Sequence, residues 1–423
     1  MKNYLQRATR IQQRINELAT FSDDLHSVNR LYGTKPFIDC GYKIASWMQD
    51  LSLETRIDNI GNIRGKLKSD NPHAKTLVIA SHLDTTSHTG RYDGILGILM
   101  GLDIIENIQS KNVSLPFHIE VIAFIEEEGI RFHTAYLGSQ VVSGVFEEKL
   151  LETKDGEGNT LAAVLQSLNY NSDEIKKDAI PPEEWMGYFE IHVEEGPILY
   201  EKNIPVGIVS AISGHKKIEI EFTGKTGHAG TVPMSMRRDA LCAAAKFISG
   251  VEKFASKEKR NIVATIGKIN IPDSASNVIP GKVNCTLDIR SDDKQLLSNA
   301  YEAINELCEK ICDKRDIYFE WKLVQETEPV ICSKKLRKLL SNSIAEKNIE
   351  IINLISGAGY DAVMISKVAP VVMLFIKCFK GASHHTLENV EDYDIAIALD
   401  ISDHFMEQII SPSEKIIKKK SIV

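Results

Sequence analysis

Histidine and carboxylate side chains gather in a few short segments of this 423-residue chain, and their order predicts metal chemistry. His82 and Asp84 stand two residues apart in SHLD, Asp93 follows in RYDG, Glu127 lies in EEEG, and His192 lies in EIHVEEG. Imidazoles and carboxylates are ligands that zinc, manganese and cobalt accept, and a carboxylate shared by two ions can hold them ~3.5–4 Å apart. A lone histidine or a glutamate pair would be weak evidence, but the ordered set predicts a metal site.

Two apolar runs lead directly into these polar segments. Residues 76–80 (TLVIA) precede SHLD, and residues 120–125 (EVIAFI) precede EEEG, with a helical pattern at 95–110 between them. Apolar strands that alternate with helices are typical of an α/β domain with a mainly parallel sheet. Because the carboxyl ends of parallel strands meet at one edge, we expect the two acidic motifs to lie side by side there.

The pattern changes from about residue 214. Strands with alternating polar residues, such as KKIEIEFTG, accompany helical patterns at 239–255 and 296–314, which is typical of an α+β domain whose sheet is covered on one face. The apolar pattern of a strand in a parallel sheet returns at APVVMLFIKC. We therefore predict a catalytic domain in two segments, residues 1–211 and 328–423, interrupted by a smaller α+β domain at 212–327.

Bulk composition limits the classes of partner. The formal net charge is −8, which gives no general attraction to nucleic acid or to an anionic membrane, and the chain has no run of 18 apolar residues. Its seven cysteines are scattered without CxxC pairs, and the amino terminus resembles an amphipathic helix rather than a signal peptide. We therefore expect a cytoplasmic protein that binds neither nucleic acid nor membranes.

The motifs become specific when they are taken in order: SHLDT, GRYDGILGILMGL, EEEGIRF, EIHVEEGP, GHAGTVPM, DIRSDD, SGAGYDA and GASHHTLE. This series resembles the amidase/carbamoylase branch of the two-metal aminoacylase/carboxypeptidase clan, and the resemblance spans nearly the whole chain. The branch includes N-carbamoyl-L-amino-acid hydrolases, allantoate amidohydrolases and β-ureidopropionases. The combination of GHAG and SGAG separates it from the peptidase branches.

The resemblance implies a role for each member of the polar set. Two divalent ions would be held by His82, Asp93, Glu128, His192 and His384, with Asp93 bridging both. Glu127 would be the general base, and the Asp84 carboxylate would orient the His82 ring. Zinc or manganese is the expected metal, and cobalt or nickel would also fit. His385 remains the alternative to His384, since the two stand side by side in SHHT.

The resemblance also implies how the substrate is bound. His228 would stabilise the oxyanion, and the inserted domain would act as a lid and form a homodimer, so His228 could serve its own chain's site or the partner's. A substrate with a free carboxylate would be held by Arg290 and Asn277, and the glycines Gly357 and Gly359 would let the backbone approach it.

Three positions depart from the family pattern: Glu195 replaces glutamine, Tyr360 replaces histidine and Thr386 replaces proline. An ionised Glu195 can only accept hydrogen bonds, so we expect it to bind a substrate N–H. The predicted reaction is hydrolysis of the carbamoyl C–N bond of an N-carbamoyl-L-amino acid, with allantoate as the alternative substrate. The lesser alternatives are an aminoacylase or peptidase and a catalytically silent metal-binding scaffold.

Overall fold

The computed structural model describes residues 1–258 and 261–411, and the chain divides into two compact units. Unit 1 consists of residues 1–210, 332–354 and the part from Gly359 onward, and unit 2 consists of residues 211–331 and 355–358. The lid and dimerisation roles assigned to residues 212–327 stay predictions. None of the helices in the described ranges has both the length and the apolar character that a membrane span requires.

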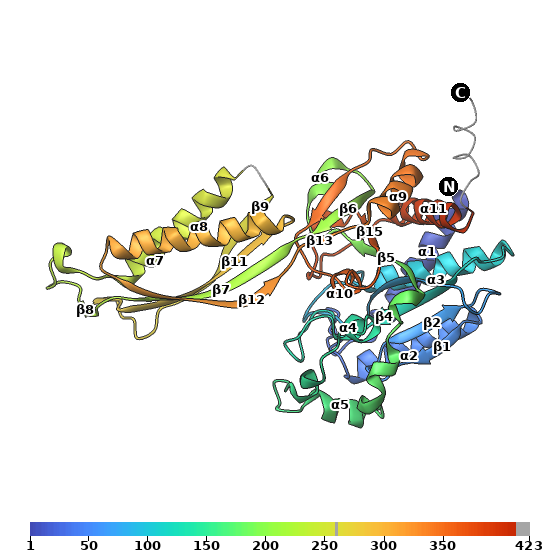
Figure 1. Ribbon diagram of the computed structural model, residues 1–423, viewed down its shortest axis with the longest axis horizontal. Helices are drawn as coiled ribbons and strands as arrows, with labels where there is room; N and C mark the ends of the chain where they lie inside the picture. The colour runs from blue at the N-terminus through green and yellow to red at the C-terminus, as the bar shows by residue number, and fades with distance from the viewer. Residues whose placement is uncertain (259–260, 412–423) are drawn as a thin grey trace. The chain divides into compact units, whose positions relative to one another are not determined.

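Unit 1 is built on a sheet whose central strands are parallel (Figure 1). The strand order is β1 (Glu54–Ile57), β2 (Ile63–Leu67), β4 (His118–Phe124), β3 (Thr76–His82), β5 (Trp185–Val193), β15 (Val371–Ile376), β6 (Val206–Ile212) and β13 (Val330–Ile331), while β14 (Asn353–Ser356) pairs with β6. Strands β4, β3, β5 and β15 run parallel to one another, and the flanking pairs are antiparallel. The predicted mixed α/β fold with a mainly parallel sheet is confirmed.

Long helices pack against this sheet and against each other. They are α1 (Lys2–Leu18), α2 (Lys35–Asp50), α3 (Ile95–Ser110), α9 (Lys334–Ala345) and α11 (Asp392–Ile410). The Arg7 guanidinium of α1 donates to Asp103 of α3 at 2.7 Å and to Asp403 of α11 at 2.5 Å, so one buried cation joins three helices. The short helices of this unit are α4 (Leu137–Val142), α5 (Leu161–Ser167), α6 (Ile198–Lys202), α10 (Ala362–Ile365), η1 (Glu148–Glu152), η2 (Ser172–Asp178), η3 (Pro182–Glu184) and η5 (Phe379–Gly381).

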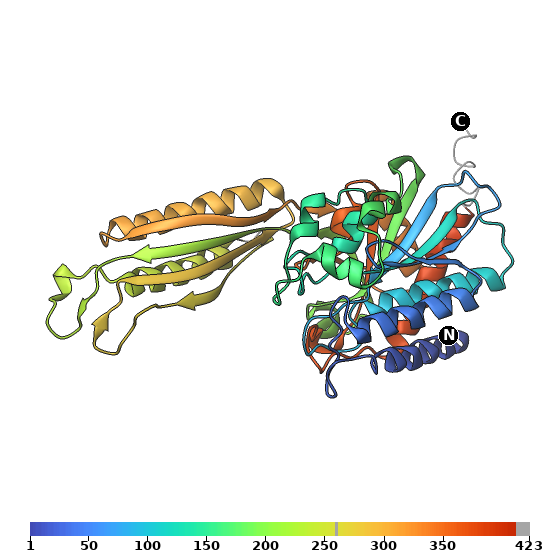
Figure 2. The same cartoon turned by 90° about the horizontal axis from the view of Figure 1, so that it is seen from below.

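Unit 2 has an antiparallel four-stranded sheet in the order β12 (Tyr318–Thr327), β7 (Gly214–Thr223), β11 (Lys282–Ser291) and β9 (Ile262–Asn270). The helices α7 (Ala240–Lys257) and α8 (Lys294–Asp313) cover one face of it (Figure 2). Residues on β7 alternate accordingly: Ile218, Ile220 and Phe222 are buried under the helices, and Glu219 is exposed on the other face. The smaller elements are β8 (Gly227–His228), β10 (Val278–Ile279) and η4 (Met234–Met236).

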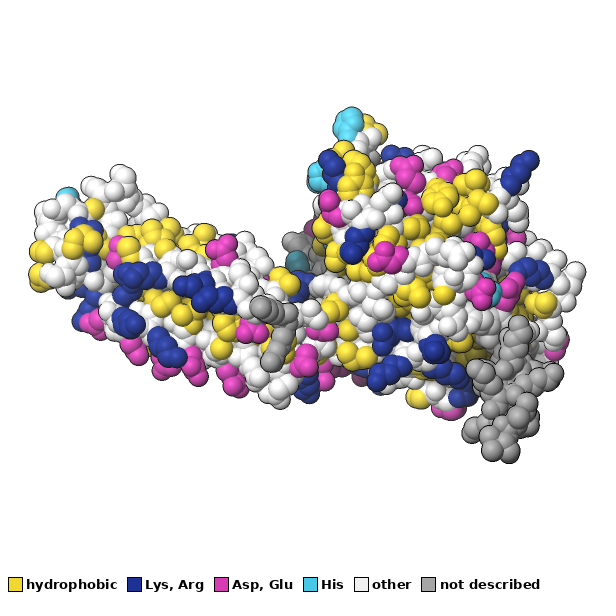
Figure 3. Space-filling view, turned by 90° about the horizontal axis from the view of Figure 1, so that it is seen from above, with side chains coloured by type: hydrophobic (Ala, Val, Ile, Leu, Met, Phe, Trp, Pro, Cys, Tyr) yellow, Lys and Arg dark blue, Asp and Glu magenta, His cyan; other side chains and the backbone are white. Residues whose placement is uncertain are grey.

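Charge is distributed without a dominant sign on the face drawn in Figure 3. Lys and Arg side chains are interspersed there with Asp and Glu side chains on both units. A mixed surface of this kind has no extended field of one sign. On this face, recognition of a charged ligand therefore has to rely on local groups.

Candidate metal centre and active site

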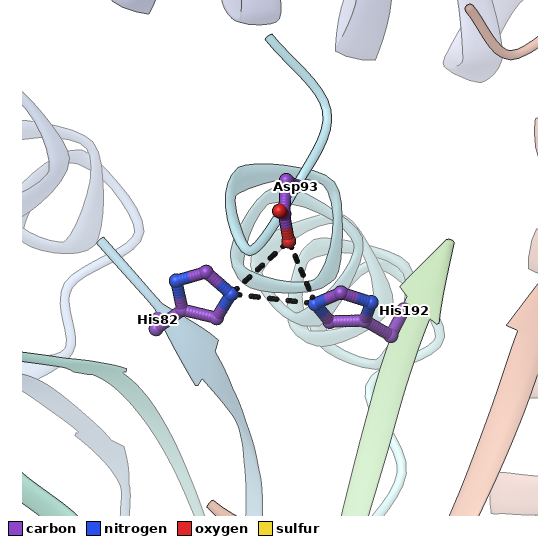
Figure 4. Close-up of side chains that lie close together, drawn as sticks. All are labelled: His82, Asp93 and His192. Carbon is purple, nitrogen blue, oxygen red and sulfur yellow. Dashed lines mark hydrogen bonds and ion pairs between the residues drawn. The ribbon is translucent and has the colours of Figure 1, made fainter. Parts of the chain in front are cut away.

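Two histidines lie at the carboxyl edge of the parallel strands. His82 is the last residue of β3, and His192 is the eighth of the nine residues of β5. Their Nε2 atoms are 3.3 Å apart, and they face the same oxygen, Asp93 Oδ1, at 3.2 Å and 3.1 Å (Figure 4). All three side chains are buried. The strand-end pattern of the sequence therefore corresponds to a compact cluster of two imidazoles and one carboxylate.

Asp93 is fixed by the tight chain segment that begins α3. Gly94 has φ +67°, and a Cβ placed there would lie 2.3 Å from the carbonyl oxygen of His82. The carboxylate of Glu388 accepts the backbone N–H of Tyr92 at 2.8 Å and that of Asp93 at 3.4 Å. Glu388 was not predicted, because nothing in a single sequence links a glutamate near the end of the chain to this loop.

Backbone carbonyls orient both imidazoles. His82 Nδ1 lies 2.9 Å from the carbonyl oxygen of Asp84, and His192 Nδ1 lies 3.0 Å from that of Val193. A ring that donates from Nδ1 leaves Nε2 as the atom that can bind a cation, and both Nε2 atoms face Asp93. The Asp84 carboxylate was expected to orient the His82 ring, but it lies 4.0 Å from Nδ1. The carbonyl of the same residue does this instead.

The Asp84 carboxylate holds the glutamate turn. Its two oxygens accept the backbone N–H groups of Glu127 at 3.1 Å and Glu128 at 3.2 Å. Glu126 has φ +47°, which ends the strand geometry at this turn. Glu126 itself folds back and accepts the N–H of Phe132 at 2.7 Å, so its carboxylate is engaged within the turn.

Asn62 fastens this turn from a neighbouring strand. Its side-chain oxygen accepts the N–H of Ile125 at 3.2 Å, and its amide nitrogen donates to the carbonyl of Gly138 at 3.1 Å. Asn62 is fully buried. It was missed because an asparagine in a short polar segment normally predicts a turn and carries no sign of a distant partner.

A second group of polar atoms lies on the other side of Asp93. His384 Nε2 is 3.2 Å from Asp93 Oδ2 and 3.1 Å from Glu128 Oε1. The two oxygens of Asp93 therefore face different sets of ligands, as a bridging carboxylate requires. His385 Nδ1 accepts the N–H of Leu387 at 3.0 Å within its own turn, which favours His384 over His385 as the ligand.

The donor set fits divalent cations. Asp93 Oδ1 and Glu128 Oε1 are buried and accept no hydrogen bond from any described residue. Burial opposes the charge of the His192 ring, but contact with Asp93 outweighs burial and raises its pKa to about 9. Asp93 and Glu128 raise the pKa of His384 to about 11. A divalent cation bound at each group would replace these ring protons and would supply the positive charge that the carboxylates lack.

Glu127 is buried beside this cluster, with 6% of its surface exposed. Burial raises the pKa of Glu127 well above its ordinary value, although His82 opposes this shift, and the neighbouring Glu128 and Asp361 add to it. A buried carboxyl group beside such a cluster can take up a proton and release it again during a reaction. The assignment of Glu127 as the general base stays a prediction.

The three residues that depart from the family pattern, Glu195, Tyr360 and Thr386, have different surroundings. Glu195 lies near His384, with 3.9 Å between Oε1 and Nε2. The ring of Tyr360 is buried edge-on against His192, with centroids 4.7 Å apart, and Thr386 is exposed. A Cβ on Gly359 would lie 2.0 Å from Tyr136 Oη, so this glycine is required by a close approach.

In unit 2, His228 and Asn277 are neighbours. β8 pairs with β10 so that His228 is opposite Val278, and the carbonyl of Asn277 accepts the N–H of Ala229 at 2.9 Å. His228 is exposed, and its Nδ1 accepts the N–H of Gly230 at 3.1 Å. The neutral ring therefore carries its proton on Nε2, where it is a hydrogen-bond donor.

Arg290 lies on β11 of the four-stranded sheet, whereas His228 lies in the separate two-stranded sheet of β8 and β10. Nε and Nη2 donate to the two oxygens of Asp288 at 3.0 Å and 2.9 Å, and Nη1 donates to the carbonyl of Gly357 at 2.6 Å. Residues 282–290 of β11 extend ~27 Å at ~3.4 Å per residue, and His228 lies beyond the Lys282 end. One small substrate cannot contact both His228 and Arg290 of the same unit.

Known proteins resemble this chain over most of its length. Residues 78–408 match peptidase family M20/M25/M40. The chain is 33% identical to allantoate deiminase 2 of Glycine max over 94% of its own length and 88% of the relative's. It is 31% identical to an N-carbamoyl-L-amino acid amidohydrolase of Geobacillus stearothermophilus over 86% and 89%. A crystal structure of a hydantoinase/carbamoylase family amidase from Burkholderia multivorans superposes with a TM-score of 0.89, at 28% identity over 95% of this chain and 98% of the other.

Proposed function

The chain belongs to peptidase family M20/M25/M40, and on this basis we propose that it is a two-metal amidohydrolase that cleaves the ureido C–N bond of a small ureido acid. N-carbamoyl-L-amino acids are the first candidate substrates, in line with the amidohydrolase of Geobacillus stearothermophilus. Allantoate is the second, in line with the allantoate deiminase of Glycine max, which is similar over 94% of the chain.

The observation that carries this proposal is the Asp93 carboxylate, which faces two ligand groups, with Glu127 buried near the ligand His82. Asp93 directs one oxygen toward His82 and His192 and the other toward His384. Two zinc or manganese ions held by these groups and Glu128 would supply an acidified water and would polarise the ureido oxygen; cobalt or nickel would suit the same donors.

Glu127 then moves the proton. Its carboxylate takes a proton from the attacking water and delivers it to the departing nitrogen, so that one group serves as base and then as acid. Asp84 keeps the turn in place by accepting the Glu127 and Glu128 N–H groups. Because Glu127 is nearly excluded from water, the proton stays with the reacting atoms.

Residues of unit 2 would bind the substrate. Arg290 would hold the substrate carboxylate, with Asp288 fixing the plane of the guanidinium, and Asn277 would assist. The Nε2–H of His228 would donate to the oxyanion. Because ~27 Å or more separates His228 from Arg290 within unit 2, we propose a homodimer in which each active site takes His228 and Asn277 from the partner chain. All seven cysteines are free thiols, which supports a reducing, cytoplasmic setting.

Ammonia release tests the proposal. Metal-loaded protein would be assayed for ammonia release from allantoate and a panel of N-carbamoyl-L-amino acids, and for release of free amino acids from a panel of dipeptides, alongside Glu127→Gln. We expect turnover of one ureido class and a loss of ~10²-fold or more in kcat for Glu127→Gln with both ions retained. Turnover of dipeptides alone would indicate a peptidase, and silence on every substrate with metal bound would support the scaffold alternative.

A further inference from the structure

Two consecutive glutamates follow β5 and turn in opposite directions. Glu194 accepts the backbone N–H groups of Ile198 at 3.1 Å and Leu199 at 2.7 Å, so it caps the first turn of α6. Its carboxylate is thereby fully engaged in holding a helix. Glu195, the next residue, points to the other side of the chain.

Glu195 joins the second ligand group. Single ligand atoms of Asp93, Glu195 and His384 all lie within 4.8 Å of one another. Around His384 Nε2, the nearest oxygens of Glu128, Asp93 and Glu195 lie at 3.1 Å, 3.2 Å and 3.9 Å. Ligand atoms bound ~2.1 Å from one ion stand ~3–4 Å apart, so these spacings are those of a shared coordination sphere.

Backbone packing fixes this spacing. Gly381 has φ +63°, and a Cβ there would lie 2.4 Å from the carbonyl carbon and oxygen of Gly196. The segment that carries Glu195 is therefore in direct contact with the segment that carries His384. The two side chains meet because both segments are anchored, one by the Glu194 cap and one by this glycine contact.

We propose that Glu195 is a ligand of the cation on the His384 side of Asp93, an inference that rests on the two-metal centre of the proposed function. The amide of the family's glutamine would bring no charge to this position, whereas Glu195 adds one negative charge. The cation there faces three carboxylates, Asp93, Glu128 and Glu195, and one imidazole. A set this rich in carboxylate strengthens binding through its charge and favours hard ions such as Mn²⁺.

This assignment replaces the expectation that Glu195 accepts a substrate N–H. A carboxylate bound to a cation directs its electron pairs at the ion and is a weaker acceptor for substrate. An experiment can separate the two roles. Substitution of a metal ligand changes the Mn²⁺ affinity without any substrate present, whereas substitution of a substrate contact changes only KM.

Chelator competition measures the role directly. Mn²⁺ stoichiometry and affinity would be determined for the wild type, Glu195→Gln and Glu195→Ala, with Glu201→Gln, at an exposed position of α6, as the matched control. We expect two Mn²⁺ per wild-type chain, a loss of ~10-fold or more in affinity at one of the two positions in both Glu195 variants, and unchanged affinities in Glu201→Gln. Circular dichroism would confirm that each variant is folded.

Two outcomes overturn the assignment and are distinguishable. Wild-type affinities at both positions in folded Glu195→Gln and Glu195→Ala, with an altered KM, would return Glu195 to the substrate. A wild-type chain that binds fewer than two Mn²⁺ would instead remove the two-metal centre, and the proposed function would fail with it.

Discussion

Replacing Gly94 with alanine should disturb the metal centre through the backbone. Gly94 has φ +67°, a conformation that costs a residue with a Cβ about 1–3 kcal/mol. The new Cβ would also lie 2.3 Å from the carbonyl oxygen of His82 and 2.7 Å from its Nδ1. Ordinary contact begins near 3.4 Å, so the His82 main chain and ring must separate from the start of α3 by about 1.1 Å (3.4 minus 2.3).

A shift of this size is large for metal ligands. His82 Nε2 and Asp93 Oδ1 are 3.2 Å apart, and ligand distances tolerate only about ±0.2 Å. Gly94 joins these two ligands, because Asp93 precedes it in the chain and the His82 ring lies against it. We therefore expect Gly94→Ala to weaken the binding of one divalent ion by ~10-fold or more and to lower the free energy of unfolding by about 1–3 kcal/mol.

Metal titration and urea unfolding would measure both effects. Gly156→Ala is the matched control, since a Cβ at Gly156 meets no atom within 4 Å. If folded Gly94→Ala bound both ions with wild-type affinity, the steric argument would be wrong. If Gly156→Ala lost the same affinity, the effect would not come from the His82 contact.

Three further results are expected. Removing divalent ions with a chelator should abolish ammonia release and lower the Tm, and readdition of Mn²⁺ or Zn²⁺ should restore both; unchanged activity after verified removal would exclude a metal mechanism. Arg7→Ala should lower the free energy of unfolding by ~3–5 kcal/mol in urea, because it leaves the buried Asp403 without its cation and leaves Asp103 with Arg10 alone, and a loss below ~1 kcal/mol would contradict this. Burial alone would raise the pKa of Glu120, but the neighbouring Arg64 guanidinium outweighs burial and holds this pKa below its ordinary value of 4.5. The Glu120–Arg64 pair therefore stabilises the folded state above pH 4.5. This stabilisation is lost as the pH falls through the lowered pKa of Glu120. Glu120→Gln should therefore have a flatter acid limb in a pH series of urea melts, and an unchanged limb would refute the assignment.

The strands that end at the site are predicted well from the sequence. The apolar runs before SHLD and EEEG form β3 and β4, which are parallel neighbours, with His82 paired to Phe124. Hydrophobic pattern alone identifies such strands, and parallel order brings their ends together. His384 was placed only by resemblance, because no local pattern connects it to residues nearly 300 positions earlier in the chain.

The supports of the site were harder to predict. Asn62 and Glu388 act through hydrogen bonds to backbone groups of distant segments, and such bonds leave no periodic trace in a sequence. The Asp84 carboxylate was assigned to the wrong neighbour for a related reason. Spacing along the chain places it near His82, but the turn at Glu126 brings two N–H groups closer to it than the ring.

The order of strands in unit 1 has a consequence for synthesis on the ribosome. β15 lies between β5 and β6, yet it is made some 160 residues after β6 ends, since it spans Val371–Ile376. A nascent chain therefore carries β5 with an open edge while residues 211–331 emerge and form their own core. We expect the growing polypeptide to depend on chaperones during this interval, and to bind the cation of the His384 group only when its last hundred residues have been translated.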